Sequence, residues 1–414
     1  MDALPHLPED VLVEILVRLP ARYIAGCRAV CRAWRSAIPH PNFDRAHAQR
    51  PTAHHEIEYY GVEGNRLLYR RLTRVVVFDF LHVGRERTPF PRALWFTLSM
   101  YTTVRGSWDG VLCLERGNWH SIRFLVDHYV LWNPLTMACA TVCTPAPGDR
   151  IIGGYAHPET RRFHLLHALG ETDHCHCHIS PTIFRILRVG DAVWRELPME
   201  DSAADPVTPM IFMRSTCRTP RVVRLHNNLH WLVSGTTVRL LVFDTTQEKF
   251  WSMKTPESHG QPLSLKTTRM SVLPCGKLCI FAAEPSSSTM ETWVLDYSGG
   301  PHGSWRLKDR ISLITWDGSD LSQEFRMANG EVVSVEDPRE GEEVLLKRFS
   351  GRVDAYNFRR KVWRTVDVFR TTSVACEHQV MHGESLLQGQ VSFANANRPL
   401  CKYVDWYGRR LYCL

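Results

Sequence analysis

The sequence lacks the long apolar runs and the charge blocks that would direct a protein to membrane or nucleic acid. No stretch approaches the roughly 18 uninterrupted apolar residues of a membrane span, and the first apolar run, from Val11 to Val17, is interrupted by Glu14. Nothing at the start resembles a signal peptide. The net charge of +7 over 414 residues is modest and comes without a basic block. We therefore expect a soluble protein of the cytoplasm or nucleus, without membrane or nucleic-acid partners.

The sequence also lacks the short motifs of common catalytic and cofactor sites. It has no G-x-x-x-x-G-K-[ST] phosphate loop and no G-x-S-x-G nucleophile elbow. Its 13 cysteines are odd in number and scattered, which argues against a disulfide framework. We expect no catalytic residue and no cofactor.

One string of metal-ligand types needs separate consideration. His174, Cys175, His176, Cys177 and His178 follow one another directly, and zinc favours such side chains in tetrahedral geometry. In a strand, however, the histidines would face one way and the cysteines the other. A site would need a loop and further ligands from elsewhere. We therefore predict no metal site, with this string as the alternative.

What the sequence does contain falls into two regions with different periods. Up to about residue 48, apolar residues recur at helical spacing and predict two helices of about 15 residues, ended by Pro20 and Pro39. The first stripe is Leu7, Val11, Leu12, Ile15, Leu16 and Leu19; the second is Ile24, Cys27, Val30, Cys31, Trp34 and Ile38. So small a unit cannot bury both stripes in a core of its own. The remaining surface must pack on the rest of the chain or on a partner.

From about residue 55 the period is that of strands. Runs such as Arg74–Phe80, Val111–Leu114 and Leu240–Asp244 alternate with turn residues, which predicts an all-β domain. Aspartates such as Asp109 and Asp244 recur in the turns. The acidic stretch of Glu336, Asp337, Glu340, Glu342 and Glu343 predicts an exposed loop.

Tryptophan marks an internal repeat in this region. Trp194, Trp251, Trp305 and Trp363 lie 57, 54 and 58 residues apart, each after a strand and a turn. A period near 50, with four short strands per unit, is typical of propeller blades. The region would hold six to eight blades. The alternative is a sandwich of similar β-hairpins.

Two segments of the helical region resemble an F-box. They are Leu7-Pro8-Glu9-Asp10-Val11-Leu12-Val13-Glu14-Ile15-Leu16-Val17-Arg18-Leu19-Pro20 and Cys27-Arg28-Ala29-Val30-Cys31-Arg32-Ala33-Trp34-Arg35. The β region resembles the F-box-associated propeller regions of plants. That resemblance lies in Gly106-Ser107-Trp108-Asp109-Gly110-Val111-Leu112-Cys113-Leu114, Leu131-Trp132-Asn133-Pro134-Leu135-Thr136 and Leu229-His230-Trp231-Leu232. It divides the chain into an F-box at 1–48 and a propeller-like domain at 49–414.

The resemblance implies a substrate-recognition subunit of an SCF-type ubiquitin ligase. The F-box would bind a Skp-type adaptor, and through it a cullin scaffold, while the propeller holds an unidentified target. The implied adaptor-binding residues are Leu7, Pro8, Val11, Leu12, Ile15, Leu16, Leu19, Val30, Cys31 and Trp34. Alternatively, Val30, Cys31 and Trp34 pack against the first helix inside the unit. The protein could also be an F-box scaffold or lectin-like binder outside a ligase, or a propeller enzyme.

Overall fold

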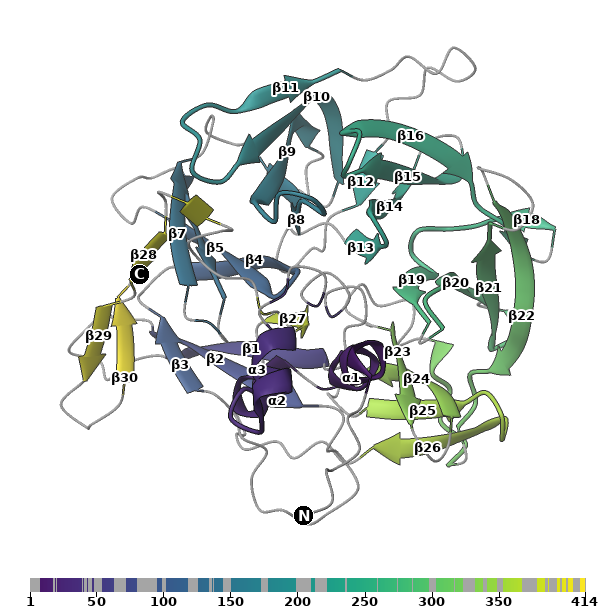
Figure 1. Ribbon diagram of the computed structural model, residues 1–414. Coiled ribbons are helices and arrows are strands. Elements are labelled where there is room, and N and C mark those ends of the chain that lie inside the picture. Colours follow the sequence, from purple (N-terminus) through teal and green to yellow (C-terminus); the bar gives the residue numbers. More distant parts are fainter. Residues whose placement is uncertain are drawn as a thin grey trace, which may run out of the picture.

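The structure is a computed structural model with helices at one end of the chain and strands throughout the rest (Figure 1). It describes residues 8–17, 19, 21–38, 40, 43, 47, 54–62, 72–79, 95–98, 102–117, 126–133, 136, 138–143, 150–172, 178–198, 210–212, 222–234, 237–258, 260–273, 275–284, 286–297, 303–315, 317–322, 332–337, 341–347, 353–366, 378–383, 386, 393–394, 397–399, 401–404 and 410–413.

Within residues 8–38, the described part of the chain forms three short helices where the sequence predicts two. They are α1 (Glu9–Leu16), α2 (Ala21–Cys27) and α3 (Arg32–Ala37). The expected second helix is broken because Cys31 is extended, with φ −158° and ψ 176°, and serves as the N-cap of α3. The apolar spacing continues through this turn, so periodicity alone could not reveal it.

The strands form six units of four antiparallel strands in the part of the chain that the structure describes. Each unit is named here a blade. Blade 1 is β27 (His378–Gly383), β1 (His54–Val62), β2 (Leu72–Asp79) and β3 (Trp95–Leu98); blade 2 is β4 (Thr102–Trp108), β5 (Val111–Gly117), β6 (Val126–Trp132) and β7 (Ala138–Cys143). Blade 3 is β8 (Arg150–Ala156), β9 (Phe163–Thr172), β10 (His178–Arg188) and β11 (Arg195–Leu197); blade 4 is β13 (Val222–Leu225), β14 (Asn228–Ser234), β15 (Val238–Asp244) and β16 (Lys249–Lys254). Blade 5 is β19 (Thr268–Val272), β20 (Leu278–Glu284), β21 (Thr289–Asp296) and β22 (Ser304–Ser312); blade 6 is β23 (Val332–Asp337), β24 (Gly341–Lys347), β25 (Val353–Asn357) and β26 (Val362–Val366).

Shorter strands join or flank these blades. β12 (Met210–Phe212) pairs with β10 and β14, so blades 3 and 4 form one nine-stranded sheet. β17 (Glu257–Ser258) and β18 (Gln261–Pro262) form a small hairpin. β28 (Asn397–Pro399) extends blade 2 beside β7, while β29 (Cys401–Val404) and β30 (Arg410–Cys413) join the sheet of blade 1.

The blades stand around a common centre (Figure 1). Their first strands are the innermost ones: β27 contacts β4, β4 contacts β8, β13 contacts β19 and β19 contacts β23. Blade 1 combines an innermost strand from the C-terminal region with three strands from the start of the β region. The fold is therefore a small helical region followed by a large all-β, propeller-like domain, as expected, and the six blades lie within the predicted range.

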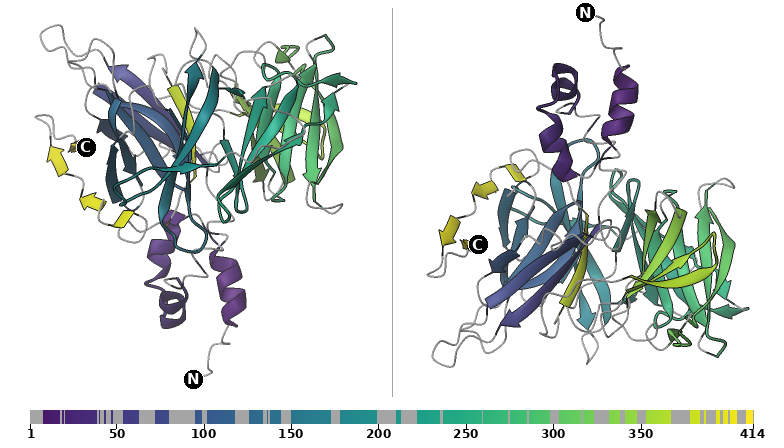
Figure 2. Two further views of the ribbon diagram at one scale, coloured as in Figure 1. Left: turned by 90° about the horizontal axis from the view of Figure 1, so that it is seen from above. Right: turned by 90° about the horizontal axis from the view of Figure 1, so that it is seen from below.

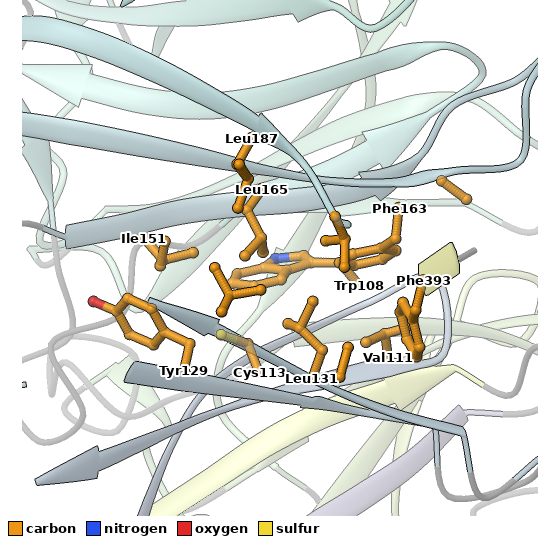
Figure 3. Packing of buried hydrophobic residues seen from close by; sticks show 14 of the residues in the cluster. Trp108, Val111, Cys113, Tyr129, Leu131, Ile151, Phe163, Leu165, Leu187 and Phe393 are labelled. Atoms are coloured by element: carbon orange, nitrogen blue, oxygen red, sulfur yellow. The ribbon is translucent and has the colours of Figure 1, made fainter. Parts of the chain in front are cut away.

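Apolar side chains fill the spaces between neighbouring blades. Figure 3 shows the core between blades 2 and 3, where Trp108 and Leu131 face Phe163 and Leu165, and all four are buried. Separate clusters lie between blades 3 and 4, 4 and 5, and 5 and 6. Strands buried on both faces explain the nearly continuous apolar runs of the sequence.

The repeated tryptophans join successive blades along their outermost strands. The indole N–H groups of Trp194, Trp305 and Trp363 each donate to a backbone carbonyl 51 residues earlier, at the end of another blade's outer strand. The acceptors are the carbonyls of Cys143, Lys254 and Ser312, at 3.2, 2.9 and 2.6 Å. The repeat predicted from tryptophan spacing is confirmed.

The acidic stretch is not the exposed loop that its composition predicts. Glu336 and Glu342 are paired in the hairpin of β23 and β24. Glu343 is buried, and its carboxylate accepts hydrogen bonds from Arg364 and Asn357. Carboxylates that find such donors can occupy a strand, a pairing that composition does not disclose.

Candidate functional site

The three helices enclose a small core of their own. Leu16 is fully buried and Leu12 nearly so, both facing Ile24 and Ile38. Phe43 and His47 close one side of this core, and the His47 ring Nε2 lies 2.8 Å from the Leu19 carbonyl oxygen. Two of the predicted adaptor-binding residues thus hold the helices together.

Other predicted adaptor-binding residues face solvent. Val11 and Ile15 lie one helical turn apart on α1 and are 42% and 43% exposed. Val30, in the turn between α2 and α3, is 62% exposed, and Cys31 beside it is also exposed. Apolar side chains displayed at helical spacing form a surface that a partner can bury.

The remaining predicted residues are divided between these two environments. Pro8 is exposed before α1, whereas Leu19 and Trp34 are partly buried against the helical core. Leu7 lies outside the described residues. Tyr23 of α2, which is not among the predicted residues, is 47% exposed.

One face of the propeller, which we name the tight-turn face, carries the turns that follow the innermost strands, such as the two-residue turn from β4 to β5. Asp109 and Gly110 join β4 to β5 with φ angles of 48° and 75°. This left-handed conformation is open to glycine and tolerated by aspartate. The Asp109 carboxylate accepts a hydrogen bond from the Ala156 N–H at 2.7 Å and pairs with Arg224, so it ties blades 2, 3 and 4 together. The turn role predicted for Asp109 holds, with this inter-blade tie in addition.

The helical unit is joined to this tight-turn face. It precedes β1, whose first residue, His54, pairs with Gly383 at the end of innermost strand β27. Innermost strands end at the tight turns, as β4 does at Asp109. Both views in Figure 2 show the helices projecting from one side of the propeller. The other side is left free of them.

Longer connections leave the opposite face, which we name the long-loop face. Residues 313–331 join blade 5 to blade 6, and residues 255–267 join blade 4 to blade 5. Their described parts are held by side-chain hydrogen bonds, such as the one from the Ser288 hydroxyl to Asp320 at 2.9 Å. Ile314 in this region is 53% exposed. Loops with exposed polar and apolar groups are common binding surfaces.

Several buried ionisable groups in the described parts of the blades have structural partners. The Glu291 carboxylate accepts from Ser258, Trp293 and Arg310 at 2.8, 3.1 and 2.9 Å. Burial lowers the pKa of His164 and of His230 to about 4, so both rings are neutral at physiological pH. These groups stabilise the blades.

Two features bear on metals and membranes. No group of three or more potential ligands gathers among the residues that the structure describes, and the string from His174 to Cys177 lies outside them. Over the same described residues, no helix has the length and apolarity to cross a bilayer.

Comparison with known proteins identifies the helical region. Residues 4–46 match the F-box domain. Over 303 residues the chain is 25% identical to a predicted F-box protein of Arabidopsis thaliana, an alignment that covers 70% of this chain and 73% of the relative. A predicted F-box/kelch-repeat protein of the same plant is 20% identical over 345 residues, with coverage of 79% and 80%.

Solved structures similar to this one are more distant. The β-propeller domain of Cps50 from Myceliophteria thermophila aligns with a TM-score of 0.41 and 14% identity, over 73% of this chain and 84% of that one. AztD from Citrobacter koseri aligns at 0.36 and 9%, over 80% and 99%. The propeller-like arrangement of this chain is shown by its own strand order and blade contacts. The chain carries an F-box domain at its N-terminus and is homologous to predicted F-box proteins of Arabidopsis.

Proposed function

We propose that this protein is the substrate-recognition subunit of an SCF-type cullin-RING ubiquitin ligase. The F-box, which we assign to residues 1–48, binds a Skp-type adaptor and through it a cullin scaffold. The domain at 49–414 binds a target protein. The observation that carries the proposal is the F-box match over residues 4–46, in a helical unit that leaves apolar side chains exposed.

The burial pattern assigns different roles to the predicted adaptor-binding residues. Val11, Ile15 and Val30, together with Pro8 and Cys31, are exposed and able to contact the adaptor directly. Leu12 and Leu16 support them from the helical core, and Leu19 and Trp34 lie between the two groups. Exposed aliphatic anchors at helical spacing are a common mode of recognition.

The target is then held on the long-loop face, away from the F-box. The helical unit adjoins the tight turns, which leaves the opposite face accessible in the assembled ligase. We infer that the subunit is non-catalytic and acts by proximity, since holding two reactants together raises their effective concentration. Its place of action would be the cytoplasm or nucleus.

The test is the affinity of the purified chain for a purified Skp-type adaptor, measured by calorimetry. The Val11→Asp, Ile15→Asp variant should lose roughly a hundredfold or more in affinity, because two charges would meet an apolar partner surface. Unchanged binding, or no binding by folded wild-type protein, would refute the proposal.

Matched controls separate binding from folding. Val362→Asp, Ile314→Asp places the same charges at exposed apolar positions of blade 6 and the long-loop face and should leave adaptor affinity unchanged. Leu16→Asp is unsuitable, since this side chain is fully buried and its replacement would unfold the helices. Circular dichroism should show wild-type helix content in both double variants.

A further inference from the structure

The outer hairpin turn of blade 6, between β25 and β26, is held together by its own residue Asn357. The Asn357 Oδ1 accepts the backbone N–H groups of Arg359 and Arg360, at 3.0 and 2.8 Å. The Lys361 N–H donates to the Asn357 carbonyl at 2.8 Å, and Lys361 has a left-handed φ of 59°. An asparagine that accepts from the residues ahead of it fixes a turn locally, so the backbone supplies every one of these contacts with Asn357.

Blade 4 has the same turn with different side chains. There the Asp244 carboxylate accepts the backbone N–H groups of Thr246 and Gln247, at 2.7 and 2.9 Å, and Glu248 has a φ of 55°. Thr246 and Gln247 stand where blade 6 has its two arginines, and these positions are exposed in both turns. The turn forms with uncharged side chains at the two positions, so its backbone does not require the arginines of blade 6.

The last residue of each turn pairs with the outer strand of the preceding blade, with the charges reversed. In blade 4, Glu248 pairs with Arg195 of β11. In blade 6, Lys361 pairs with Asp309 of β22. The two junctions therefore use the same geometry, and blade 6 carries its cations on the turn.

The ion pairs of blade 6 turn their carboxylates inward and their cations outward. The Lys361 side chain is 56% exposed and that of Asp309 is 13% exposed. The Arg364 side chain of β26 is 44% exposed and that of Glu343 is 2% exposed. The surface that solvent meets is therefore positive. We name it the basic corner, and its exposed cations are Arg306 of β22, Arg359, Arg360, Lys361 and Arg364.

The basic corner lies at the tight-turn face of the propeller. β25 runs in the same direction as the innermost strand β23, because both are antiparallel to β24. Its last residue, Asn357, is therefore at the face where innermost strands end. The long-loop face, where the target is proposed to bind, is on the other side.

We propose that the basic corner is a second binding surface, which takes an acidic segment of a partner protein. Guanidinium groups match carboxylates in a planar, bidentate geometry. The turn that carries Arg359 and Arg360 is already fixed by Asn357, so less backbone freedom is lost on binding. The surface belongs to the propeller-like domain alone, so the proposal does not depend on assembly into a ligase.

The test is fluorescence anisotropy of a fluorescein-labelled peptide of alternating glutamate and glycine, titrated with the full chain at low salt. We expect saturable binding that weakens as salt screens the charges, and none with a peptide of glutamine and glycine. The Arg359→Thr, Arg360→Gln variant has the side chains of the blade 4 turn. It should bind the acidic peptide about tenfold more weakly, because two charge-assisted contacts are lost.

A matched variant separates this surface from the general positive charge of the chain. Lys254→Gln, Lys266→Gln removes two exposed cations near the connection between blades 4 and 5 and should keep the wild-type affinity. Equal weakening in the two double variants, or no binding by the wild type, would overturn the proposal.

Urea unfolding checks that the arginines serve binding and not the fold. The denaturant midpoint of the Arg359→Thr, Arg360→Gln variant should equal that of the wild type, because the blade 4 turn forms with the same side chains. A clearly lower midpoint would assign the two arginines to the fold and count against the proposal. Neither measurement uses the adaptor, so both stand whether or not the ligase proposal fails.

Discussion

At the scale of single residues, two buried histidines bond to backbone carbonyls within the blades. The His164 ring stacks on the Tyr155 ring, with the ring centroids 5.1 Å apart. The His164 Nδ1 lies 2.9 Å from the Arg162 carbonyl oxygen. His230 is fully buried, with Nδ1 3.2 Å from the Val223 carbonyl oxygen. Each ring bonds as a neutral donor, so protonation would place a charge in the apolar interior.

These two histidines should make the fold sensitive to mild acid. Burial holds both pKa values at about 4, against about 6.5 in the unfolded chain. Between these two pKa values the unfolded state binds more protons than the folded state. The free energy of unfolding therefore has its full value above about pH 6.5 and falls as the pH drops towards 4. Each histidine accounts for roughly 3 kcal/mol of this loss.

Urea unfolding at pH 7.5 and pH 5 measures the effect. His230→Gln should reduce the difference between the two pH values, because glutamine does not titrate. A wild-type unfolding free energy that is the same at both pH values would contradict the prediction.

At the scale of elements, each blade is joined to its neighbours by apolar packing and by the repeated tryptophans. The Trp363 side chain is buried against Tyr356, and its N–H reaches the Ser312 carbonyl of blade 5. An ion pair adds to the junction between blades 5 and 6. The Lys308 Nζ of outer strand β22 lies 2.5 Å from the Glu342 carboxylate of β24. Because the acceptor is a backbone carbonyl, it can be any residue type, which is why only the tryptophan is visible as a repeat.

Replacing one of these tryptophans should weaken the junction between two blades. Trp363→Phe keeps an aromatic ring but removes the donor, and we expect the free energy of unfolding to fall by about 1 to 2 kcal/mol. Trp305→Phe should lose a similar amount, whereas Tyr297→Phe, at an exposed position, should change little. Denaturant midpoints measure all three. A Trp363→Phe protein as stable as the wild type would mean that the hydrogen bond contributes nothing net.

At the scale of the whole molecule, blade 1 is completed by pairing between distant parts of the chain. β27 lies beside β1 over six residue pairs, from His54 with Gly383 to Tyr59 with His378. It also contacts β4 of blade 2. The same C-terminal region then supplies Leu386 to the core of the helical unit, so blade 1 and that core both include residues from this stretch of sequence.

Removal of residues 378–414 should therefore open the ring and release the helices together. It would turn β1, which still pairs with β2, into an edge strand with one side unpaired, and exposed edges favour aggregation. We expect the truncated chain to lose cooperative unfolding in denaturant and to expose β1 and α1 to amide exchange. A truncated protein with a wild-type transition would show that the other five blades are stable without closure.

The sequence by itself determined the division into helices and blades, the tryptophan repeat and the F-box motif, because each is written in local spacing. Tertiary structure decided what spacing leaves open. One apolar stripe on α1 contains both buried residues, Leu12 and Leu16, and exposed ones, Val11 and Ile15. Only the packing of α1 against its neighbours decides which members are buried. Likewise, Glu343 reads as a loop residue until Arg364, 21 residues away, supplies its partner. Contacts between residues far apart in the chain, such as Leu386 on the F-box helices, have no local pattern, so only the folded molecule reveals them.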